Sequence, residues 1–321
     1  MTEFNSLQPG VQLIRSGLYL VAMLLGLGVV FLPSQALAAT QTLCAGSAIP
    51  AGWVLKDMYR DSFKCTNSLS TYQWNVWVIE SHTDKAEGTS MRVCVGLVPE
   101  GWLKTDIVDS GTQCGRDYNA RDNVWTLYKK QSTDTRLTVC AGYVPGGWFK
   151  TDFYDHDTRC AGDPFVHNQD NVWVIERYDN APEGTTLHVC VGFQPYDWVK
   201  KNIYTSSTKC GRYNNIYNNV WVLSKIAATD TSLVTCAGYV PADFIKTDFY
   251  PQSYQCGLDY NTTTYNMWVV DRYNTRPIGS TMKVCAGFLP TGWSHIGTST
   301  STAQCGRGTA NSNIWTIRRD F

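Results

Sequence analysis

The sequence has no excess of charge of either sign, since 27 Lys and Arg residues balance 27 Asp and Glu residues among 321. A neutral chain with scattered charges presents no basic field, which argues against nucleic acid and anionic membrane surfaces as partners. No window places apolar residues at the spacing of an amphipathic helix, so we expect little helix. The chain is nonetheless 43% hydrophobic and 13% aromatic, which is too apolar for disorder.

Sequence motifs of catalysis and of metal binding are also missing. There is no G-x-S-x-G, H-E-x-x-H or Gly-rich phosphate loop. Catalysis needs one asymmetric set of groups, whereas each recurring charged group occurs in several modules. Zinc sites favour close pairs such as C-x-x-C, which do not occur, and the five histidines do not recur with the cysteines. The segment Asp155-His156-Asp157 is a candidate for calcium, but it lacks an EF-hand ladder. We therefore expect no enzyme, no metal and no cofactor.

One long apolar run lies near the N-terminus, from Leu18 to Leu32, after Arg15 and before a segment that ends at Ala38. This is the order of a secretory signal peptide covering residues 1–38. The run is shorter than the roughly twenty residues of a spanning helix, so we expect cleavage rather than an uncleaved anchor. The mature chain is then secreted, periplasmic or at the cell surface, without stable membrane insertion.

Twelve cysteines are spaced regularly along the rest of the chain. Within consecutive pairs the separation is 21 residues once and 20 residues five times, whereas the gap to the next pair varies from 26 to 30. A period near 48 residues is typical of repeat architectures. The sequence predicts six modules, which cover residues 39–92, 93–138, 139–188, 189–234, 235–283 and 284–321.

The constant separation within each cysteine pair is what a covalent link would impose. We therefore predict one disulfide per module, each closing a loop worth about 3 kcal/mol in the chain-entropy model. The export signal agrees with this, because disulfides persist outside the cytosol. The predicted bridges are Cys44–Cys65, Cys94–Cys114, Cys140–Cys160, Cys190–Cys210, Cys236–Cys256 and Cys285–Cys305.

Each module reads as strands and turns. In the third module, residues 137–143 alternate between apolar and polar, residues 148–154 and 171–175 are rich in aromatic and β-branched residues, and a short stretch surrounds Cys160. Connectors of two lengths alternate between modules, which predicts three pairs of modules and argues against two β-trefoils. The fold class is all-β, either an open array or a six-bladed propeller-like ring. We favour the array, since Ser294-His295-Ile296 replaces the recurring Lys-Thr-Asp in the last module.

Two tryptophan series recur with the modules. The second series lies inside the strongest strand and is expected to form the core, whereas the first follows a turn and is expected to pack on the disulfide or to contact ligand. The Lys-Thr-Asp segments are expected to form a solvated strand face, and the Asn before each second tryptophan to bond the local backbone. The first series is Trp53, Trp102, Trp148, Trp198, Phe244 and Trp293, and the second is Trp77, Trp125, Trp173, Trp221, Trp268 and Trp315.

The modules differ most between the second cysteine and this Asn. Variable loops on a repeated frame are where recognition residues are usually placed, although ordinary turn chemistry explains such loops as well. Their aromatic, Asn and Asp side chains suit a polyhydroxylated ligand, except in module six, which has no loop aromatic. The candidate ligand-binding residues are Tyr72, Trp74, Asp117, Tyr118, Asn119, Asp163, Phe165, Asn168, Tyr213, Asn214, Tyr217, Asp259, Tyr260, Asn261 and Tyr265.

The leading functional hypothesis is a secreted, multivalent binding protein for carbohydrate, such as a cell-surface polysaccharide, in which repetition adds weak sites together. The alternative is a structural or assembly protein of the cell envelope that uses the stapled repeats as spacers. The sequence does not decide between them.

Overall fold

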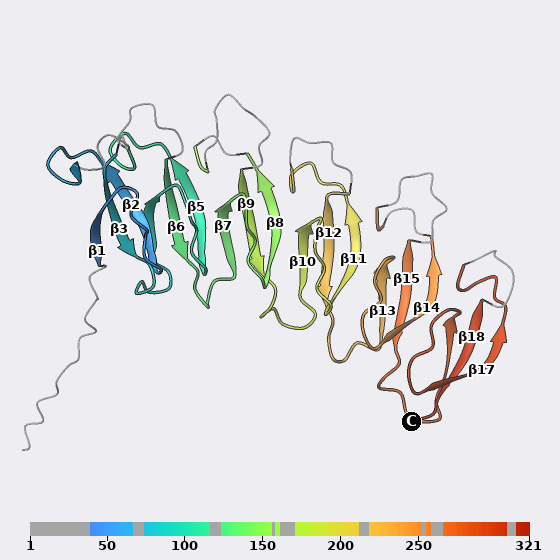
Figure 1. Cartoon of the computed structure of the whole chain (residues 1–321). Coiled ribbons are helices and arrows are strands. Elements are labelled where there is room, and N and C mark those ends of the chain that lie inside the picture. Colours follow the sequence, from blue (N-terminus) through green and yellow to red (C-terminus); the bar gives the residue numbers. More distant parts are fainter. Residues whose placement is uncertain are drawn as a thin grey trace, which may run out of the picture. The chain divides into compact units, whose positions relative to one another are not determined.

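The computed structural model describes residues 39–66, 74–115, 123–155, 158–160, 171–211, 218–251, 255–257, 266–306 and 313–321. These residues form eighteen strands and no α-helix, arranged as six three-stranded sheets (Figure 1). Each sheet holds one cysteine pair, and its first strand begins about three residues before the predicted start of modules two to six. No sheet closes into a barrel, so the modules form an open array and the ring is not formed. Among the described residues, no helix has the length and apolarity needed to cross a membrane.

Every module uses the same three strands. The first strands are β1 (Thr40–Cys44), β4 (Ser90–Cys94), β7 (Arg136–Cys140), β10 (Thr186–Cys190), β13 (Ser232–Cys236) and β16 (Thr281–Cys285). The second strands are β2 (Trp53–Tyr59), β5 (Trp102–Val108), β8 (Trp148–Tyr154), β11 (Trp198–Tyr204), β14 (Phe244–Tyr250) and β17 (Trp293–Ser299). The third strands are β3 (Val76–Ser81), β6 (Val124–Lys129), β9 (Val172–Arg177), β12 (Val220–Lys225), β15 (Met267–Arg272) and β18 (Ile314–Arg319).

The third strand of each module lies in the middle of its sheet and pairs antiparallel with both others, as in the order β7-β9-β8. A turn that begins at proline joins the first two strands, and in module three the Trp148 N–H donates to the Pro145 carbonyl. The second strand carries a bulge in every module, between Lys150 and Asp152 in module three. A bulge re-aims the side chains next to it, and those side chains build the contacts between modules.

All six predicted disulfides are present, and no described cysteine is free. Each bridge ties the end of the first strand to the segment that precedes the third. The expected short strand around the second cysteine is wrong, because that cysteine has a φ between 52° and 58° in every module. A left-handed residue cannot continue an extended strand.

The hydrophobic cores lie between modules. Leu103 of β5 enters the core of module three and packs with Val139, Trp148 and Ile175. A second cluster packs Ile107 of the same strand against the Cys140–Cys160 disulfide. The residues that enter the next core at the other junctions are Val54, Phe149, Val199 and Ile245.

The expectation for the two tryptophan series is reversed in the structure. The first series is buried from module two onward, with Trp102 at 2% and Trp198 at 0% exposure, and Phe244 takes the same place in module five. The second series is half-buried in every module. The preceding module covers the side chains of the first series. Their burial therefore cannot be inferred from the sequence of one module alone.

The alternating connectors also have a structural basis. The long connector after module one places the Glu87 carboxylate 3.0 Å from the Ser132 N–H in the following short connector. The Glu183 carboxylate meets the Ala228 N–H in the same way at 2.8 Å. Ile278 stands at the corresponding position of the third long connector and is exposed.

Candidate binding grooves between the modules

In modules one to five, a carboxylate or amide oxygen on the second strand accepts a hydrogen bond from a cysteine N–H of the following module, a contact that we call the clasp. The Asp152 Oδ1 of module three accepts the Cys210 N–H of module four at 2.8 Å. Asn202 serves module five in the same way, since its Oδ1 lies 2.9 Å from the Cys256 nitrogen. The other three clasps are Asp57 to Cys114, Asp106 to Cys160 and Asp248 to Cys305. The Asp of the Lys-Thr-Asp segment therefore joins modules instead of facing solvent.

The Asn before each second tryptophan fixes the cysteine segment from within the module, which confirms its backbone role but not the expectation that the partners are local in sequence. The Asn219 Oδ1 accepts the Ser206 N–H at 2.7 Å, and its Nδ2 donates to the carbonyls of Ser206 and Lys209, each at 2.9 Å. The residues it reaches are 10 to 13 positions away, so the contact spans the loop. Each clasped cysteine is thus held from both sides.

The lysine of the same segment lies over the half-buried tryptophan of the central strand. The Lys104 Nζ is 4.7 Å from the centre of the Trp125 ring, and the Lys246 Nζ is 4.7 Å from that of Trp268. Lys150 and Lys200 make the same contact with Trp173 and Trp221. Burial lowers the pKa of Lys104, Lys200 and Lys246, because it removes water from the ammonium group.

A groove of about 760 Å³ lies at the junction of modules two and three, and we call it the 2/3 groove. One wall is the turn and strand from Val98 to Lys104, and the other is the end of β7 with Ala141, Gly142 and Tyr143. Tyr143 is 69% exposed, which leaves an aromatic face and a hydroxyl open at the groove. The expectation that Tyr143 continues the first strand is wrong, because β7 ends at Cys140.

An equivalent groove of about 400 Å³ lies at the junction of modules five and six, and we call it the 5/6 groove. Its walls are the segment from Val240 to Lys246 and the segment Ala286-Gly287-Phe288, which occupy the same places in their modules. Phe288 is exposed in the position of Tyr143. The two grooves are therefore one structural site that occurs twice.

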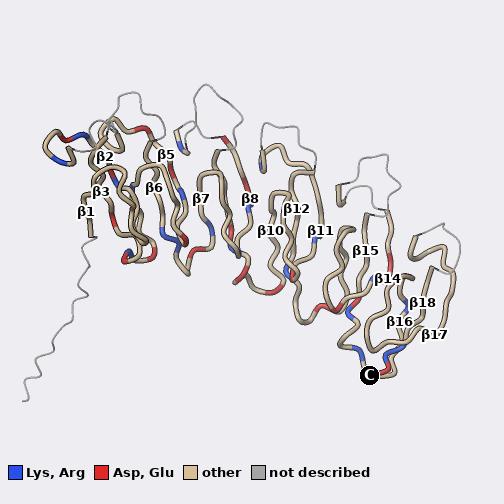
Figure 2. The backbone as a smooth tube through the Cα atoms, in the orientation of Figure 1, with Lys and Arg blue, Asp and Glu red and all other residues tan. Residues whose placement is uncertain are grey.

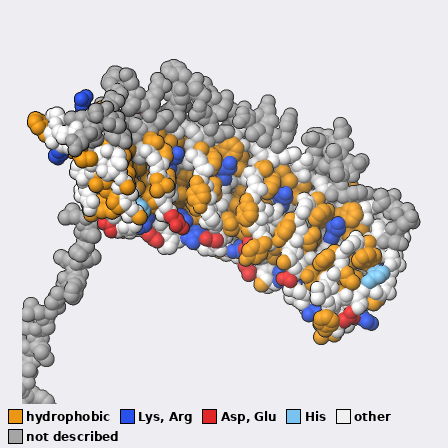
Figure 3. Space-filling view, viewed as in Figure 1, with side chains coloured by type: hydrophobic (Ala, Val, Ile, Leu, Met, Phe, Trp, Pro, Cys, Tyr) orange, Lys and Arg blue, Asp and Glu red, His pale blue; other side chains and the backbone are white. Residues whose placement is uncertain are grey.

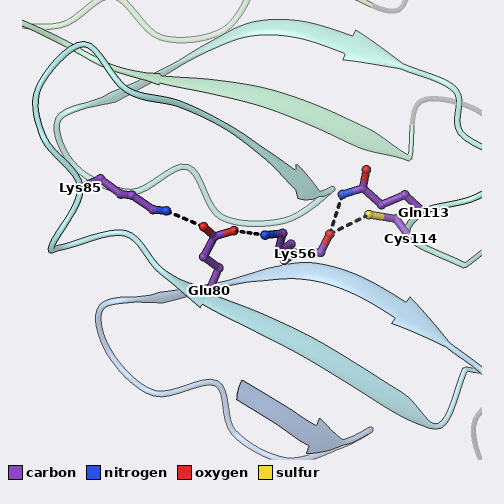
Figure 4. A network of polar contacts seen from close by, with 5 residues as sticks. All are labelled: Lys56, Glu80, Lys85, Gln113 and Cys114. Atoms are coloured by element: carbon purple, nitrogen blue, oxygen red, sulfur yellow. Dashed lines mark hydrogen bonds and ion pairs between the residues drawn. The ribbon is translucent and has the colours of Figure 1, made fainter. Parts of the chain in front are cut away.

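The 4/5 and 1/2 junctions carry altered versions of this site. Between modules four and five, the Tyr239 hydroxyl donates to the Tyr196 carbonyl at 3.2 Å and links the two walls. Between modules one and two, Leu55 stands in the place of the lysine. Module one instead binds the Glu80 carboxylate between Lys56 and Lys85 (Figure 4). Burial would raise the pKa of Glu80, but the two ammonium groups outweigh burial and lower it.

Hydrophobic and basic groups share one face of the molecule. Figure 2 shows Lys and Arg at intervals along the strands of successive modules. In the space-filling view, isolated Lys or Arg side chains lie among hydrophobic ones, while Asp and Glu gather along one edge (Figure 3). Each groove also has one carboxylate in its lining, Glu100 in the 2/3 groove and Asp243 in the 5/6 groove.

Of the fifteen predicted ligand residues, only Trp74 lies among the described residues. Its indole packs on the next module, because a Cβ added at Gly115 would lie 3.1 Å from the indole Nε1. The remaining fourteen, Tyr72, Asp117, Tyr118, Asn119, Asp163, Phe165, Asn168, Tyr213, Asn214, Tyr217, Asp259, Tyr260, Asn261 and Tyr265, lie outside the described residues, as does the signal peptide. The part of the chain that the structure describes contains no acidic, His and Cys cluster able to hold a metal, and the calcium candidate includes Asp157 beyond it.

Sequence reasoning missed the grooves because they form between modules. A signal was present, since an aromatic or leucine follows each Cys-x-Gly from module two onward at Leu97, Tyr143, Phe193, Tyr239 and Phe288.

Comparison with protein-family models, curated proteins and solved structures gave no match. The six disulfides fit an oxidising, extracytosolic environment.

Proposed function

We propose that the chain is a secreted, non-enzymatic protein that binds an extended carbohydrate polymer at several modules at once. The observation that carries this proposal is the recurrence of one groove at two junctions, 2/3 and 5/6, with matching walls. A repeating site suits a polymer with a repeating unit, because binding at one groove raises the effective concentration at the next.

The chemistry of the grooves supports a sugar ligand. Tyr143 and Phe288 offer flat apolar faces, on which the C–H face of a pyranose ring can stack. The turn backbones and the lysines supply hydrogen-bond donors for ring hydroxyls. The variable loops with their Tyr, Asn and Asp residues remain part of this proposal as additional contacts.

Polysaccharide pull-down tests the proposal with alanine variants. We expect Tyr143→Ala combined with Phe288→Ala to reduce retention by about tenfold, since two equivalent sites are lost together. Phe63→Ala is the matched control, because Phe63 is 94% exposed and does not line either groove. Alanine substitution of Asp117, Tyr118 and Asn119 tests the loops separately. Equal retention of all variants and the wild type would rule out both kinds of contact.

A structural role in the cell envelope is the second candidate. The observation that favours it is the sharing of cores across junctions, as with Phe149 in the core of module four, which stiffens the row beyond what its disulfides achieve. Negative-stain images that show filaments or lattices of the mature protein, together with no retention on any polysaccharide, would favour this role.

A further inference from the structure

Among the residues that the structure describes, the lysines of the two grooves have no acidic partner. Within the described residues, neither Lys104 nor Lys246 forms an ion pair. Both are half-buried and lie over tryptophan rings, and each lines its groove. A tryptophan face offsets part of the lost hydration of an ammonium group. It leaves the remaining N–H donors of the lysine available to the groove.

The nearest carboxylates in sequence are engaged elsewhere. The Asp106 carboxylate, two residues from Lys104, accepts the N–H groups of Ile107 and Cys160. The Asp248 carboxylate, two residues from Lys246, accepts those of Phe249 and Cys305. These backbone contacts hold the module junction together. No ion pair among the described residues therefore competes with an anionic ligand for either lysine.

From this arrangement we propose that the 2/3 and 5/6 grooves bind the anionic groups of an acidic polysaccharide, with Lys104 and Lys246 as the charged contacts. This inference rests on the proposed carbohydrate-binding function and adds the charge of the ligand. Tyr143 and Phe288 stack on the sugar ring that carries the anion. Burial lowers the pKa of both lysines, because it destabilises their charged form. An anion in the groove stabilises that charged form, which supports the assignment.

Repetition favours a polysaccharide over an acidic protein segment. The two grooves present the same lysine and an aromatic at the same place in their modules, and a polysaccharide with a uronate or sulfate in each repeat offers the same group many times. The 4/5 junction has a lysine but its walls are linked by Tyr239. The 1/2 junction has Leu55 instead. We expect these two junctions to contribute less.

The test compares charged and neutralised forms of one polymer. We expect the mature protein to bind polygalacturonate or dextran sulfate at least about tenfold more tightly than methyl-esterified polygalacturonate or dextran. We also expect the affinity to fall as salt rises, because ion pairs at partly exposed sites are screened. The measurements are made by biolayer interferometry at two salt concentrations. The salt dependence of the wild type tests the inference without any variant.

The matched variants are K104M with K246M against K64M with K209M. Both pairs remove two positive charges, but Lys64 and Lys209 are exposed and do not line the grooves. We expect the groove pair to lose about tenfold or more in affinity for the acidic polymer and the control pair to lose little. Unchanged circular dichroism confirms folding of both pairs.

Each contrary result has a distinct meaning. Equal binding of charged and neutral polymers, or equal loss in the two variant pairs, overturns the acidic ligand and leaves the carbohydrate function standing. Binding of poly-glutamate as tight as that of the acidic polysaccharides overturns the assignment of the ligand as a polysaccharide. No binding to any of these polymers overturns the carbohydrate function itself.

Discussion

At the scale of the residue, one position on the second strand decides how neighbouring modules join. Its side-chain oxygen accepts an N–H from a cysteine that the left-handed backbone turns toward it, and the position is Asp in four modules and Asn202 in another. The amide and the carboxylate are equivalent here because the contact needs an acceptor and does not need a charge.

This equivalence predicts how substitutions of Asp152 behave. Asp152→Ala leaves the buried Cys210 N–H without its acceptor and should lower the free energy of unfolding by about 1–3 kcal/mol. Asp152→Asn should cost less than about 1 kcal/mol, because Asn202 already makes the contact in module four. Urea unfolding of both variants measures the difference. Equal costs would show that the charge of Asp152 matters more than its hydrogen bond.

Glu80 provides a prediction on pH. Its pKa is lowered below the ordinary 4.5 in the folded protein, since Lys56 and Lys85 outweigh the effect of burial. A lowered folded-state pKa means that the stabilisation is complete above pH 4.5 and is lost as pH falls through the lower folded value. Glu80→Gln should therefore cost about 1–3 kcal/mol at pH 7 and progressively less below pH 4.5.

Thermal unfolding of the wild type and Glu80→Gln between pH 7 and pH 3 measures this difference. Glu100→Gln is the control, because Glu100 is exposed and forms no ion pair among the described residues. A gap between wild type and Glu80→Gln that stays constant with pH would contradict the role of the two lysines.

At the scale of the element, turns that contain a residue with positive φ determine how consecutive strands are connected. Gly184 of the long connector has a φ of +75°, and its N–H donates to the Lys225 carbonyl at 3.0 Å. We predict that Gly184→Ala lowers the unfolding free energy by about 1 kcal/mol, because a Cβ strains this conformation although space is open around it.

The control for this prediction is Gly111→Ala. Gly111 also has open space around it and no left-handed φ, so alanine should be neutral or stabilise by a few tenths of a kcal/mol. Guanidinium unfolding of both variants compares them. If the two substitutions change the unfolding free energy equally, backbone strain at position 184 does not explain the requirement for glycine in the connector.

Strands, disulfides and modules were predictable from sequence because each depends on residues within one period. The cysteine spacing predicted all six bridges, and the Asn before each second tryptophan was correctly given a backbone role. The burial of Trp102 and the clasp of Asp106 were missed because both depend on the neighbouring module. The grooves were missed for the same reason.

At the scale of the whole molecule, stability passes from module to module through shared cores, as in other repeat proteins. The side chains that make the outgoing contacts change in module six. Ser294 stands where Ile245 enters the next core, and Gly297, which has no side-chain acceptor, stands where Asp248 accepts an N–H. The outgoing face of module six therefore lacks the groups that join the other modules.

Removal of module six tests this view of the array. A chain that ends at Ser280 exposes Ile245, which is otherwise 2% exposed, and leaves Asp248 without the Cys305 N–H. We expect the shortened protein to self-associate in size-exclusion chromatography, because an uncovered core residue adds an apolar patch at the end of the row. Adding Ile245→Ser, which copies Ser294 at the same position, should restore the elution volume expected from chain length for the same association state as the full chain. If the shortened chain elutes and unfolds like the full chain without this substitution, the cores are not shared in the way that Ile245, Met282 and Trp293 indicate.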